Sequence, residues 1–548
     1  MSSATATSTP AASPWTPLRR PVFRAIWLAS LISSIGSAMN DTAAVWTMST
    51  LSSSPLLLSV MATVSAVPIF LLSLPAGALA DVLDRRRILL VAQSWMFAAA
   101  TLLSAAAWMG GIQPWVLLSV AACLGIGVAF NSPAWGSIMP DLVTRDEMPA
   151  AVTLGSLSLN ISRAIGPAFA GALIAAFGPA VCFSLNAASF LAVLFAIQRW
   201  RPEKKPAPLR GERFFGALTA ACRYAAHAPA MQTVLVRTFA FILCGVAVTS
   251  LLPIQATHRL NLPASQFGFL MGAFGCGAIT MAVVGLPRLR ARLTPDALMH
   301  LATAALGVVL LAMTLANHLS LLLPVTFLGG AAWIAGISNL SVAGQSAMPP
   351  WARGRMNALY VTVMQGSIAL GGLLWGQTTS TAGLTVALAS AGSGLLATML
   401  LALKFPLSLP YGLDLSAATP VTSHSFAEPP QPGDGPIVVT VEYFVSKPRV
   451  VEFLTAMKPL RLHRLRDGAV RWSVTQDLGA PTRFIEEFTV ESWAEHLRQH
   501  ERMALSDTEI HARVRSFHEG GEAPRVQHFI ARDVRVPAFP ISITNSVT

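Results

Sequence analysis

Residues 77–87, Gly-Ala-Leu-Ala-Asp-Val-Leu-Asp-Arg-Arg-Arg, form a short charged segment between two long apolar runs. The run before its charges covers residues 56–80, and the run after them covers 88–109. A membrane-spanning helix needs about 20 apolar residues, so both runs predict spans and the charged segment is the loop that joins them. Lys and Arg near span ends stay on the cytoplasmic side, which places this loop in the cytoplasm.

The same alternation of apolar runs and short polar loops extends to Lys404. The chain is 53% hydrophobic and only 12% charged, and nine of its 26 acidic residues precede Lys404. We predict twelve spans, six before and six after the longest internal polar stretch, which is typical of transporters built from two bundles. The predicted spans are 23–48, 56–80, 88–109, 114–138, 150–176, 179–199, 238–257, 265–287, 297–316, 319–345, 355–379 and 382–403.

The net charge of +12 does not indicate nucleic-acid binding, because the basic residues form short clusters between spans and do not gather on one face. These clusters occupy every second loop, which predicts that both termini are cytoplasmic. The first apolar run is too long for a signal peptide. The five cysteines are isolated from one another, which argues against a disulfide framework or a metal cluster.

Changes in composition predict six parts. They are a disordered cytoplasmic tail (1–20), an N-terminal six-helix bundle (21–200), a basic cytoplasmic connector (201–237), a C-terminal six-helix bundle (238–404), a Pro/Ser/Gly-rich linker (405–436) and a small soluble domain (437–535). In the soluble domain the periodicity predicts a strand from 437 to 445, a helix after Val450, strands at 471–478 and 483–491, a helix at 493–518 and a strand at 525–534. This βαββαβ order is the split, ferredoxin-like arrangement.

An ATP-driven pump encoded in one chain would need a phosphate-binding loop that ends in Gly-Lys-Ser/Thr. No glycine precedes any of the five lysines, Lys204, Lys205, Lys404, Lys447 and Lys458. The sequence therefore favours a carrier driven by an ion gradient, unless a separate subunit supplies an ATPase.

The segment 77–87 resembles the loop between spans two and three of the major facilitator superfamily, whose pattern is Gly-x-x-x-Asp-Arg-x-Gly-Arg-Arg. Gly77, Asp81, Arg85 and Arg86 match this pattern, whereas Val82 replaces an arginine and Asp84 replaces a glycine. The resemblance implies a conformational gate in which a carboxylate at a helix end and an arginine pair across the boundary between the two bundles. The alternative is that the arginines only orient the chain in the membrane.

The fifth predicted span contains Ser162-Arg-Ala-Ile-Gly166-Pro167-Ala-Phe-Ala-Gly171, which resembles the Gly-x-x-x-Gly-Pro-x-x-Gly-Gly motif of exporters in this superfamily. Ser162 and Ala170 replace two of the glycines. A proline within a helix frees a carbonyl and permits a bend, and small neighbours permit close packing. Together with 140–147, 186–190 and 353–355, the motif is similar to the drug and siderophore exporters that include the enterobactin exporter and macrolide efflux proteins.

Away from the span ends, the predicted spans contain two charged residues, Asp41 and Arg163, and charges within the membrane are costly and usually functional. Asp41 is 19 residues after Val22, about 28 Å along a helix. It either faces the transport cavity and exchanges protons or is a hydrated acid at the outer interface. Arg163 binds an anionic substrate, pairs with a carboxylate or bonds backbone carbonyls.

In the soluble domain, His496 and His500 share one helical face, but Leu497 stands where a zinc protease has glutamate. We interpret the pair as a solvated face and expect no catalytic residue, metal or cofactor. The domain resembles the antibiotic-biosynthesis monooxygenase group, which implies either dimerisation or an enzymatic role.

These observations predict a multi-pass protein of a bacterial cytoplasmic membrane. It is expected to export small amphipathic molecules such as drugs, siderophores or secondary metabolites in exchange for protons, and it is not an enzyme. Two alternatives remain: an importer of a small metabolite, and a fusion in which the soluble domain binds or modifies the transported ligand. Asparagines, glutamines and tryptophans in the spans do not identify a substrate.

Overall fold

The computed structural model describes residues 15–61, 63–144, 147–200, 214–408, 414 and 430–531. The predicted N-terminal tail and most of the predicted linker lie outside these residues. The chain divides into two compact units. The helical unit comprises Met1–Leu218, Ala230–Met348 and Ala352–Gly412, and the sheet unit comprises Thr219–Pro229, Pro349–Trp351 and Leu413–Thr548.

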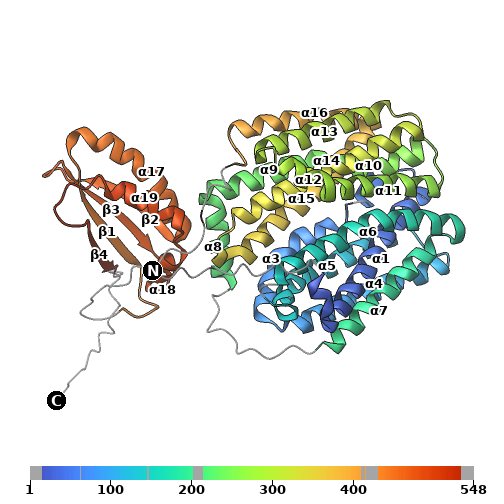
Figure 1. Cartoon of the computed structure of the whole chain (residues 1–548), viewed down its shortest axis with the longest axis horizontal. Helices are drawn as coiled ribbons and strands as arrows, with labels where there is room; N and C mark the ends of the chain where they lie inside the picture. The colour runs from blue at the N-terminus through green and yellow to red at the C-terminus, as the bar shows by residue number, and fades with distance from the viewer. Residues whose placement is uncertain are drawn as a thin grey trace, which may run out of the picture. The chain divides into compact units, whose positions relative to one another are not determined.

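The helical unit is a bundle of long helices packed side by side (Figure 1). Its first half contains α1 (Pro21–Leu51), α2 (Pro55–Met61), α3 (Ala66–Val82), α4 (Arg85–Trp108), α5 (Pro114–Leu142), α6 (Met148–Phe177) and α7 (Pro179–Arg199). Its second half contains α9 (Pro229–Gly245), α10 (Ala247–Ile254), α11 (Ala264–Thr280), α12 (Leu286–Arg290), α13 (Pro295–Leu315), α14 (Leu319–Ser346), α15 (Arg353–Ala382) and α16 (Leu384–Ala397). The helix α8 (Phe214–His227) lies between the halves in sequence.

Among the described residues, ten helices are long and apolar enough to cross a membrane. The pair α2 and α3, bent by 47°, adds an eleventh span if it is counted as one. The helix α6 is 30 residues long and contains the apolar stretch Ile165–Phe177. With α6 included, the helices fill the predicted ranges and confirm a polytopic helical fold.

In each half, a glycine with positive φ joins two successive long helices. The 30-residue helix α6 ends at Gly178, whose φ is 82°, and α7 begins at the next residue. The 30-residue helix α15 ends at Gly383, whose φ is 89°, and α16 follows directly. Because glycine adopts positive φ without a steric penalty, each of these residues allows the chain to reverse abruptly between two spans.

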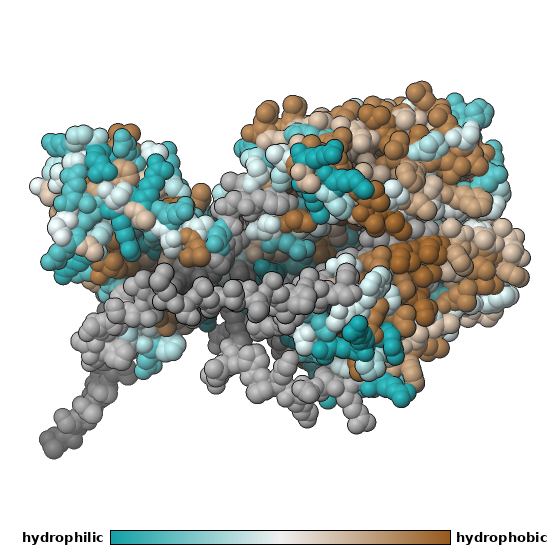
Figure 2. Space-filling view, viewed as in Figure 1, coloured by the Kyte–Doolittle hydropathy of each residue, from teal (hydrophilic) through white to brown (hydrophobic). Residues whose placement is uncertain are grey.

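The outer surface of the helical unit is apolar, as Figure 2 shows in brown over the long helices. Large apolar side chains such as Leu71, Val91 and Val308 are exposed there. A monomeric soluble protein rarely exposes apolar surface on this scale, whereas a bilayer solvates it. Polar backbone groups are hydrogen-bonded within the helices, as the membrane interior requires.

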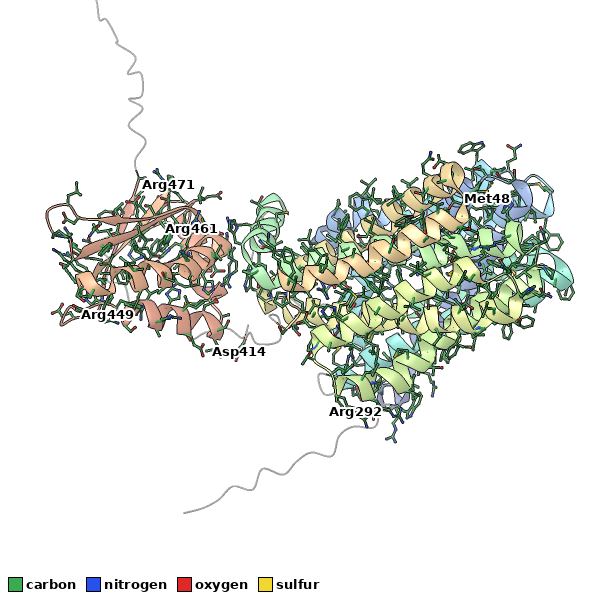
Figure 3. All side chains as sticks on the ribbon, turned by 90° about the horizontal axis from the view of Figure 1, so that it is seen from above. Met48, Arg292, Asp414, Arg449, Arg461 and Arg471 are labelled. Carbon is green, nitrogen blue, oxygen red and sulfur yellow. The ribbon has the colours of Figure 1, made fainter. Side chains whose placement is uncertain are left out.

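The sheet unit contains a four-stranded antiparallel sheet in the order β2-β3-β1-β4. Its elements are β1 (Ile437–Phe444), α17 (Val450–Asp467), β2 (Ala469–Gln476), β3 (Arg483–Val490), α18 (Trp493–Arg502), α19 (Leu505–Arg515) and β4 (Arg525–Ile530). This order confirms the ferredoxin-like arrangement. Alternate residues of β1 and β3 are buried, and Phe453, Phe484 and Phe517 form the core beneath the helices. Charged residues such as Arg461 and Arg471 cover the outside (Figure 3).

One helix of the sheet unit differs from the expectation. The sequence predicts one helix over 493–518, but the structure has two, α18 and α19. Met503 adopts an extended backbone conformation, and Asp507 accepts a hydrogen bond from the backbone N–H of Ala504 at 2.9 Å. The carboxylate therefore caps a new helix start, and this cap ends the continuous helix.

Candidate functional site

The first boundary between the halves runs along α3 and α15 and includes Gly77. An added Cβ at Gly77 would lie 3.6 Å from the Cβ of Ala358 on α15. Further along the same boundary, the hydroxyl oxygens of Ser73 and Thr362 are 2.6 Å apart. Gly77 therefore lies where one half faces the other, which is the position that a gate requires.

The arginines after Gly77 lie at the start of α4. Arg85 Nη1 is 3.7 Å from a carboxylate oxygen of Asp141 on α5. Arg86 donates hydrogen bonds to the carbonyls of Ile197 and Gln198 at the end of α7. These partners belong to the same half of the bundle, so these contacts join α4 to α5 and α7.

Asp84 has a structural role that the sequence pattern does not reveal. Its carboxylate accepts hydrogen bonds from the backbone N–H groups of Arg86 and Arg87 and caps α4. Aspartate at this position also stabilises the positive end of the helix dipole. This cap explains how α4 starts abruptly although the family pattern has glycine there. The side chain of Asp81, the fourth predicted gate residue, lies outside the described part of the chain.

The second boundary between the halves runs along α6 and α11 and contains the predicted exporter motif. A Cβ on Gly166 would lie 2.6 Å from the Cβ of Ala38 on α1. A Cβ on Gly171 would lie 2.7 Å from the Cα of Gly268 on α11. Pro167 lies inside α6, and its carbonyl oxygen would be 3.1 Å from a Cβ on Gly268. The motif thus brings α6 into backbone contact with both α1 and α11.

Arg163 lies one turn before Gly166 in α6, and its side chain is not among those that the structure describes. Asp41 lies in α1, next to the buried Asn40. The side chain of Asp41 is exposed. Five residues later, Trp46 stacks on Phe267 of α11 with ring centroids 6.0 Å apart. Asp41 and the glycine motif are therefore placed near contacts of α1 and α6 with α11.

Sequence reasoning missed two charged sites in the helical unit. Arg237, assigned to the basic connector, lies within α9 and is only 4% exposed. Its guanidinium interacts electrostatically with the carboxylate of Asp296 at the start of α13. Arg20 donates to a carboxylate oxygen of Glu147 at 2.7 Å, which joins the starts of α1 and α6. The apolar residues around Arg237 in 229–245 were the signal for its burial, whereas the sequence separation of 127 residues hides the Arg20–Glu147 pair.

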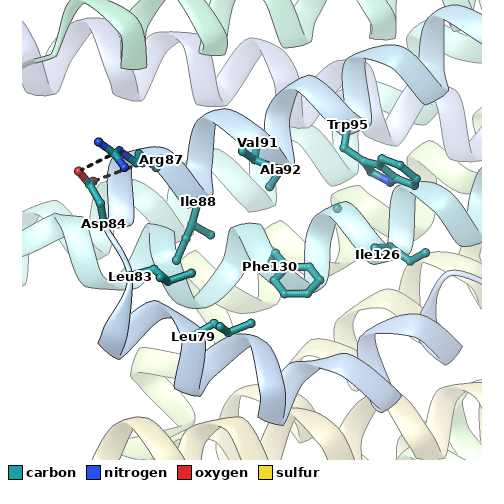
Figure 4. Close-up of a pocket in the computed structure, with 11 residues that line it drawn as sticks. Leu79, Leu83, Asp84, Arg87, Ile88, Val91, Ala92, Trp95, Ile126 and Phe130 are labelled. Carbon is teal, nitrogen blue, oxygen red and sulfur yellow. Dashed lines mark hydrogen bonds and ion pairs between the residues drawn. The ribbon is translucent and has the colours of Figure 1, made fainter. Parts of the chain in front are cut away.

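An apolar groove of about 490 Å³ lies among α3, α4 and α5 (Figure 4). Its walls include Leu79, Ile88 and Phe130, and among the described residues Asp84 and Arg87 line it at one end. Val91 and Trp95, which also line it, are exposed on the bundle surface. The residues that line it in the described part of the chain belong to α3, α4 and α5 of the first half, or cap α4, so this groove is a feature of the outer surface of that half.

In the sheet unit, the interpretation of His496 as part of a solvated face is wrong. His496 is 2% exposed and packs against Trp493, with ring centroids 5.1 Å apart. Its Nε2 lies 3.1 Å from Nε2 of His528 on β4 and 3.3 Å from Nε2 of His500. The spacing of His496 and His500 on one helix cannot show that β4 covers that face.

A buried carboxylate lies at the centre of the sheet. Glu486 is fully buried and accepts hydrogen bonds from Arg464 at 3.0 Å, Trp472 at 3.1 Å and Tyr443 at 3.2 Å. Burial, together with the charge of Glu486, raises the pKa of Tyr443. A buried carboxylate is tolerated when it is paired and hydrogen-bonded. Arg464 supplies the opposite charge, and all three residues donate hydrogen bonds. We therefore interpret Glu486 as a structural residue.

Comparison with known proteins settles the family. The model of the transmembrane secretion effector family matches residues 12–535, which includes both units. The chain belongs to this family. It is therefore a multi-pass membrane transporter of the major facilitator type, and the relatives below are also transporters.

Bacterial relatives of this chain are named as transporters and exporters. The staphyloferrin A transporter of Staphylococcus aureus is 27% identical over 56% of this chain and 77% of its own length. The enterobactin exporter of Escherichia coli is 25% identical over 65% of the chain and 85% of its own length. A macrolide efflux protein of Streptococcus pyogenes is 26% identical over 32% of the chain and 42% of its own length.

Solved structures confirm the fold of the helical unit. A bacterial homologue of the lysosomal transporter Spinster, in an inward-facing conformation, aligns with a TM-score of 0.55 at 15% identity and covers 72% of this chain and 98% of its own. A peptide transporter of the POT family in complex with sulfate aligns with a TM-score of 0.58 at 12% identity, covering 71% of this chain and 96% of its own.

Proposed function

We propose that this transporter exports small amphipathic molecules, of the siderophore, drug or secondary-metabolite class, by gradient-driven alternating access. The match to the secretion effector family over nearly the whole chain carries this proposal. The exporter-like glycine motif of α6 supports it, because Gly171 lies at the contact of α6 with α11, where the two halves must slide or separate, and Gly166 lets α6 pack closely on α1 within the first half. The lack of a Gly-Lys phosphate-loop sequence in the chain favours an ion gradient as the energy source.

In the proposed mechanism the first half, α1–α7, rocks against the second half, α9–α16, around a site near the membrane midplane. The contacts along α3–α15 and α6–α11 are the two surfaces that change. Protons are the proposed coupling ion, with Asp41 as the group that binds them. The Arg-rich helix ends, including Arg85–Arg87 and Arg288–Arg292, are placed at the cytoplasmic face of a bacterial inner membrane, with both termini inside.

A role in dimerisation is proposed for the sheet unit. The side of the sheet opposite α17 presents Val438 on β1, and Phe529, paired with Val438 on β4, is 49% exposed. Neighbouring positions on this side carry both charge signs, with Glu442 opposite Arg525. An apolar patch with charges of both signs around it suits a second copy of the same face.

The test of export is the accumulation of several dyes, antibiotics and siderophores in efflux-deficient cells that express the protein, with and without a protonophore. Lower accumulation that the protonophore abolishes supports gradient-driven export. Higher accumulation of any compound would instead establish import. Lower accumulation that persists with the protonophore would contradict proton coupling and point to another energy source. Cells expressing Asp81→Asn at the same membrane level provide the comparison, because this variant is expected to export more slowly.

A further inference from the structure

Two short segments that lie between membrane spans in the sequence belong to the sheet unit. Thr219–Pro229 forms the end of α8, and Pro349–Trp351 precedes α15. Both are grouped with residues 413–548 in one compact unit. Contacts to these segments come from Glu495 and Arg502 of α18 and from Arg466 of α17.

Glu495 is the ionic centre of this contact. One of its carboxylate oxygens, Oε1, accepts a hydrogen bond from Arg223 of α8 at 2.8 Å and another from Arg502 at 2.6 Å. The side chains of Arg223, Arg502 and Glu495 are 15%, 4% and 10% exposed. Burial alone would raise the pKa of Glu495, but its hydrogen bond with Arg502 and the charges of Arg502 and Arg223 lower it. The carboxylate is therefore ionised at neutral pH.

Aromatic side chains surround the ionic centre. Tyr224 is buried and meets Trp351 edge to face, with ring centroids 5.9 Å apart. The guanidinium of Arg502 lies over Trp351 at 4.8 Å, and that of Arg466 lies over Tyr224 at 5.7 Å. Cation–π contacts of this kind gain strength when water is excluded. Tyr224 is only 3% exposed, and this burial raises the pKa of Tyr224 to about 12.

The sheet unit holds its arginines in place independently of the two segments. Arg502 also donates to the backbone carbonyl of Asp467 at 2.8 Å. Arg466 forms ion pairs with Asp467 at 2.6 Å and with Asp507 at 2.5 Å. Because these side chains are already oriented, little conformational entropy is lost when α8 and Trp351 bind. The surface therefore has the properties of a preformed docking site.

We propose that the sheet unit is an intramolecular clamp: its α18 face binds Arg223, Tyr224 and Trp351 and so joins the starts of α9 and α15. Pro229 ends the bound segment and is also the first residue of α9, and Trp351 lies two residues before the first residue of α15. Both helices belong to the second half of the bundle. The clamp keeps their ends together while that half moves as a rigid body.

The experiment is hydrogen exchange by mass spectrometry on the full-length protein in lipid nanodiscs. Arg223→Gln and Trp351→Ala remove the bound partners and leave residues 413–548 unchanged. Peptides covering 219–229 and 347–352 are expected to exchange about tenfold faster or more in each variant, because opening of a docked segment is governed by its local contacts. Peptides of β1 and β3 should keep their protection. Unchanged exchange of 219–229 in Arg223→Gln would overturn the clamp.

A matched pair of substitutions tests the other side of the contact. Glu495→Gln removes the ionic centre, whereas Glu491→Gln makes the same chemical change at an exposed residue four positions earlier. Only Glu495→Gln should release 219–229. If both variants release this segment equally, the specific role of Glu495 is refuted. Exchange is measured without substrate, so the clamp and the proposed export function can fail separately. Where export is detectable, release of the clamp should slow it by about threefold or more, since the second half then moves less rigidly.

Discussion

Gly171 of α6 and Gly268 of α11 meet backbone to backbone across the boundary between the two halves. A Cβ on Gly171 would lie 2.7 Å from the Cα of Gly268, and a Cβ on Gly268 would lie 2.6 Å from the Cα of Gly171. No side chain larger than hydrogen fits at either position without moving one helix. The spacing of the two helices is therefore set by these two glycines.

Gly171→Ala should destabilise the conformation described here by about 1–3 kcal/mol, the usual cost of overpacking. Because the added methyl meets backbone and not a flexible side chain, α6 and α11 must separate. We expect a lower melting temperature of the purified protein and slower export. Gly155→Ala in the same helix is the control, since nothing lies within 4 Å of its added Cβ. Equal effects of the two substitutions would show that the contact of Gly171 with α11 determines neither the melting temperature nor the export rate.

The sequence was sufficient for the spans and for the order of strands and helices in the sheet unit, because apolar run length and periodicity are local signals. It could not show the break between α2 and α3, where no proline interrupts residues 62–65. It also placed Arg237 in a loop and His496 on a solvated face. Both side chains are buried by elements that are distant in sequence, which no local pattern contains.

The candidate site was predicted in part. The matches at Gly77 and Gly171 do lie at the two boundaries between the halves, because small residues are required wherever helix backbones approach closely. The partners of Arg85 and Arg86 were not predictable, since Asp141 and the end of α7 come together with α4 only in the folded bundle.

Asp81→Asn is expected to slow export without preventing membrane insertion, because it removes the charge of the predicted gate but keeps the size of the side chain. Arg85→Gln should act in the same direction and cost less than about 1 kcal/mol of stability, because its pair with Asp141 is partly exposed. Export rate per inserted molecule measures both effects.

Arg87→Gln is the control for the gate substitutions. Its side chain is 86% exposed, and its distance to Asp84 is 3.9 Å, so its loss removes the same charge from the same loop with little change in contacts. If Arg87→Gln slows export as much as Arg85→Gln, the arginines act through total charge, and the gate assignment is wrong.

The sheet unit should lose stability as the pH falls from about 6.5 to about 4. Burial, the largest effect, lowers the pKa of His463 from 6.5 to about 4, although Asp507 opposes this shift. The unfolded chain therefore binds a proton in this range that the folded domain does not. The contribution of His463, about 3 kcal/mol, is fully present above pH 6.5 and is lost as the pH falls toward 4.

This loss is measurable as the pH dependence of amide exchange in β1 and β3 of the full-length protein, corrected for the intrinsic exchange rate. His463→Gln should flatten the dependence between pH 6.5 and 4, because the titrating group is gone. His511, whose pKa is lowered to about 2 mainly by burial, still titrates in the unfolded chain and leaves a residual slope. A dependence unchanged in His463→Gln would assign the acid sensitivity to other groups.

Asp41→Asn is expected to abolish the part of export that a protonophore inhibits. Asp41 lies within the apolar helix α1 with an exposed side chain, and a carboxylate inside a membrane domain is costly unless it serves transport. Asparagine keeps the size and polarity of the side chain but carries no titratable proton. If Asp41 is the coupling group, the variant should still exchange a labelled substrate across proteoliposomes without net accumulation, since exchange needs no proton release. If the variant retains uphill transport driven by an imposed pH gradient, Asp41 is an interfacial acid and the proton is carried elsewhere.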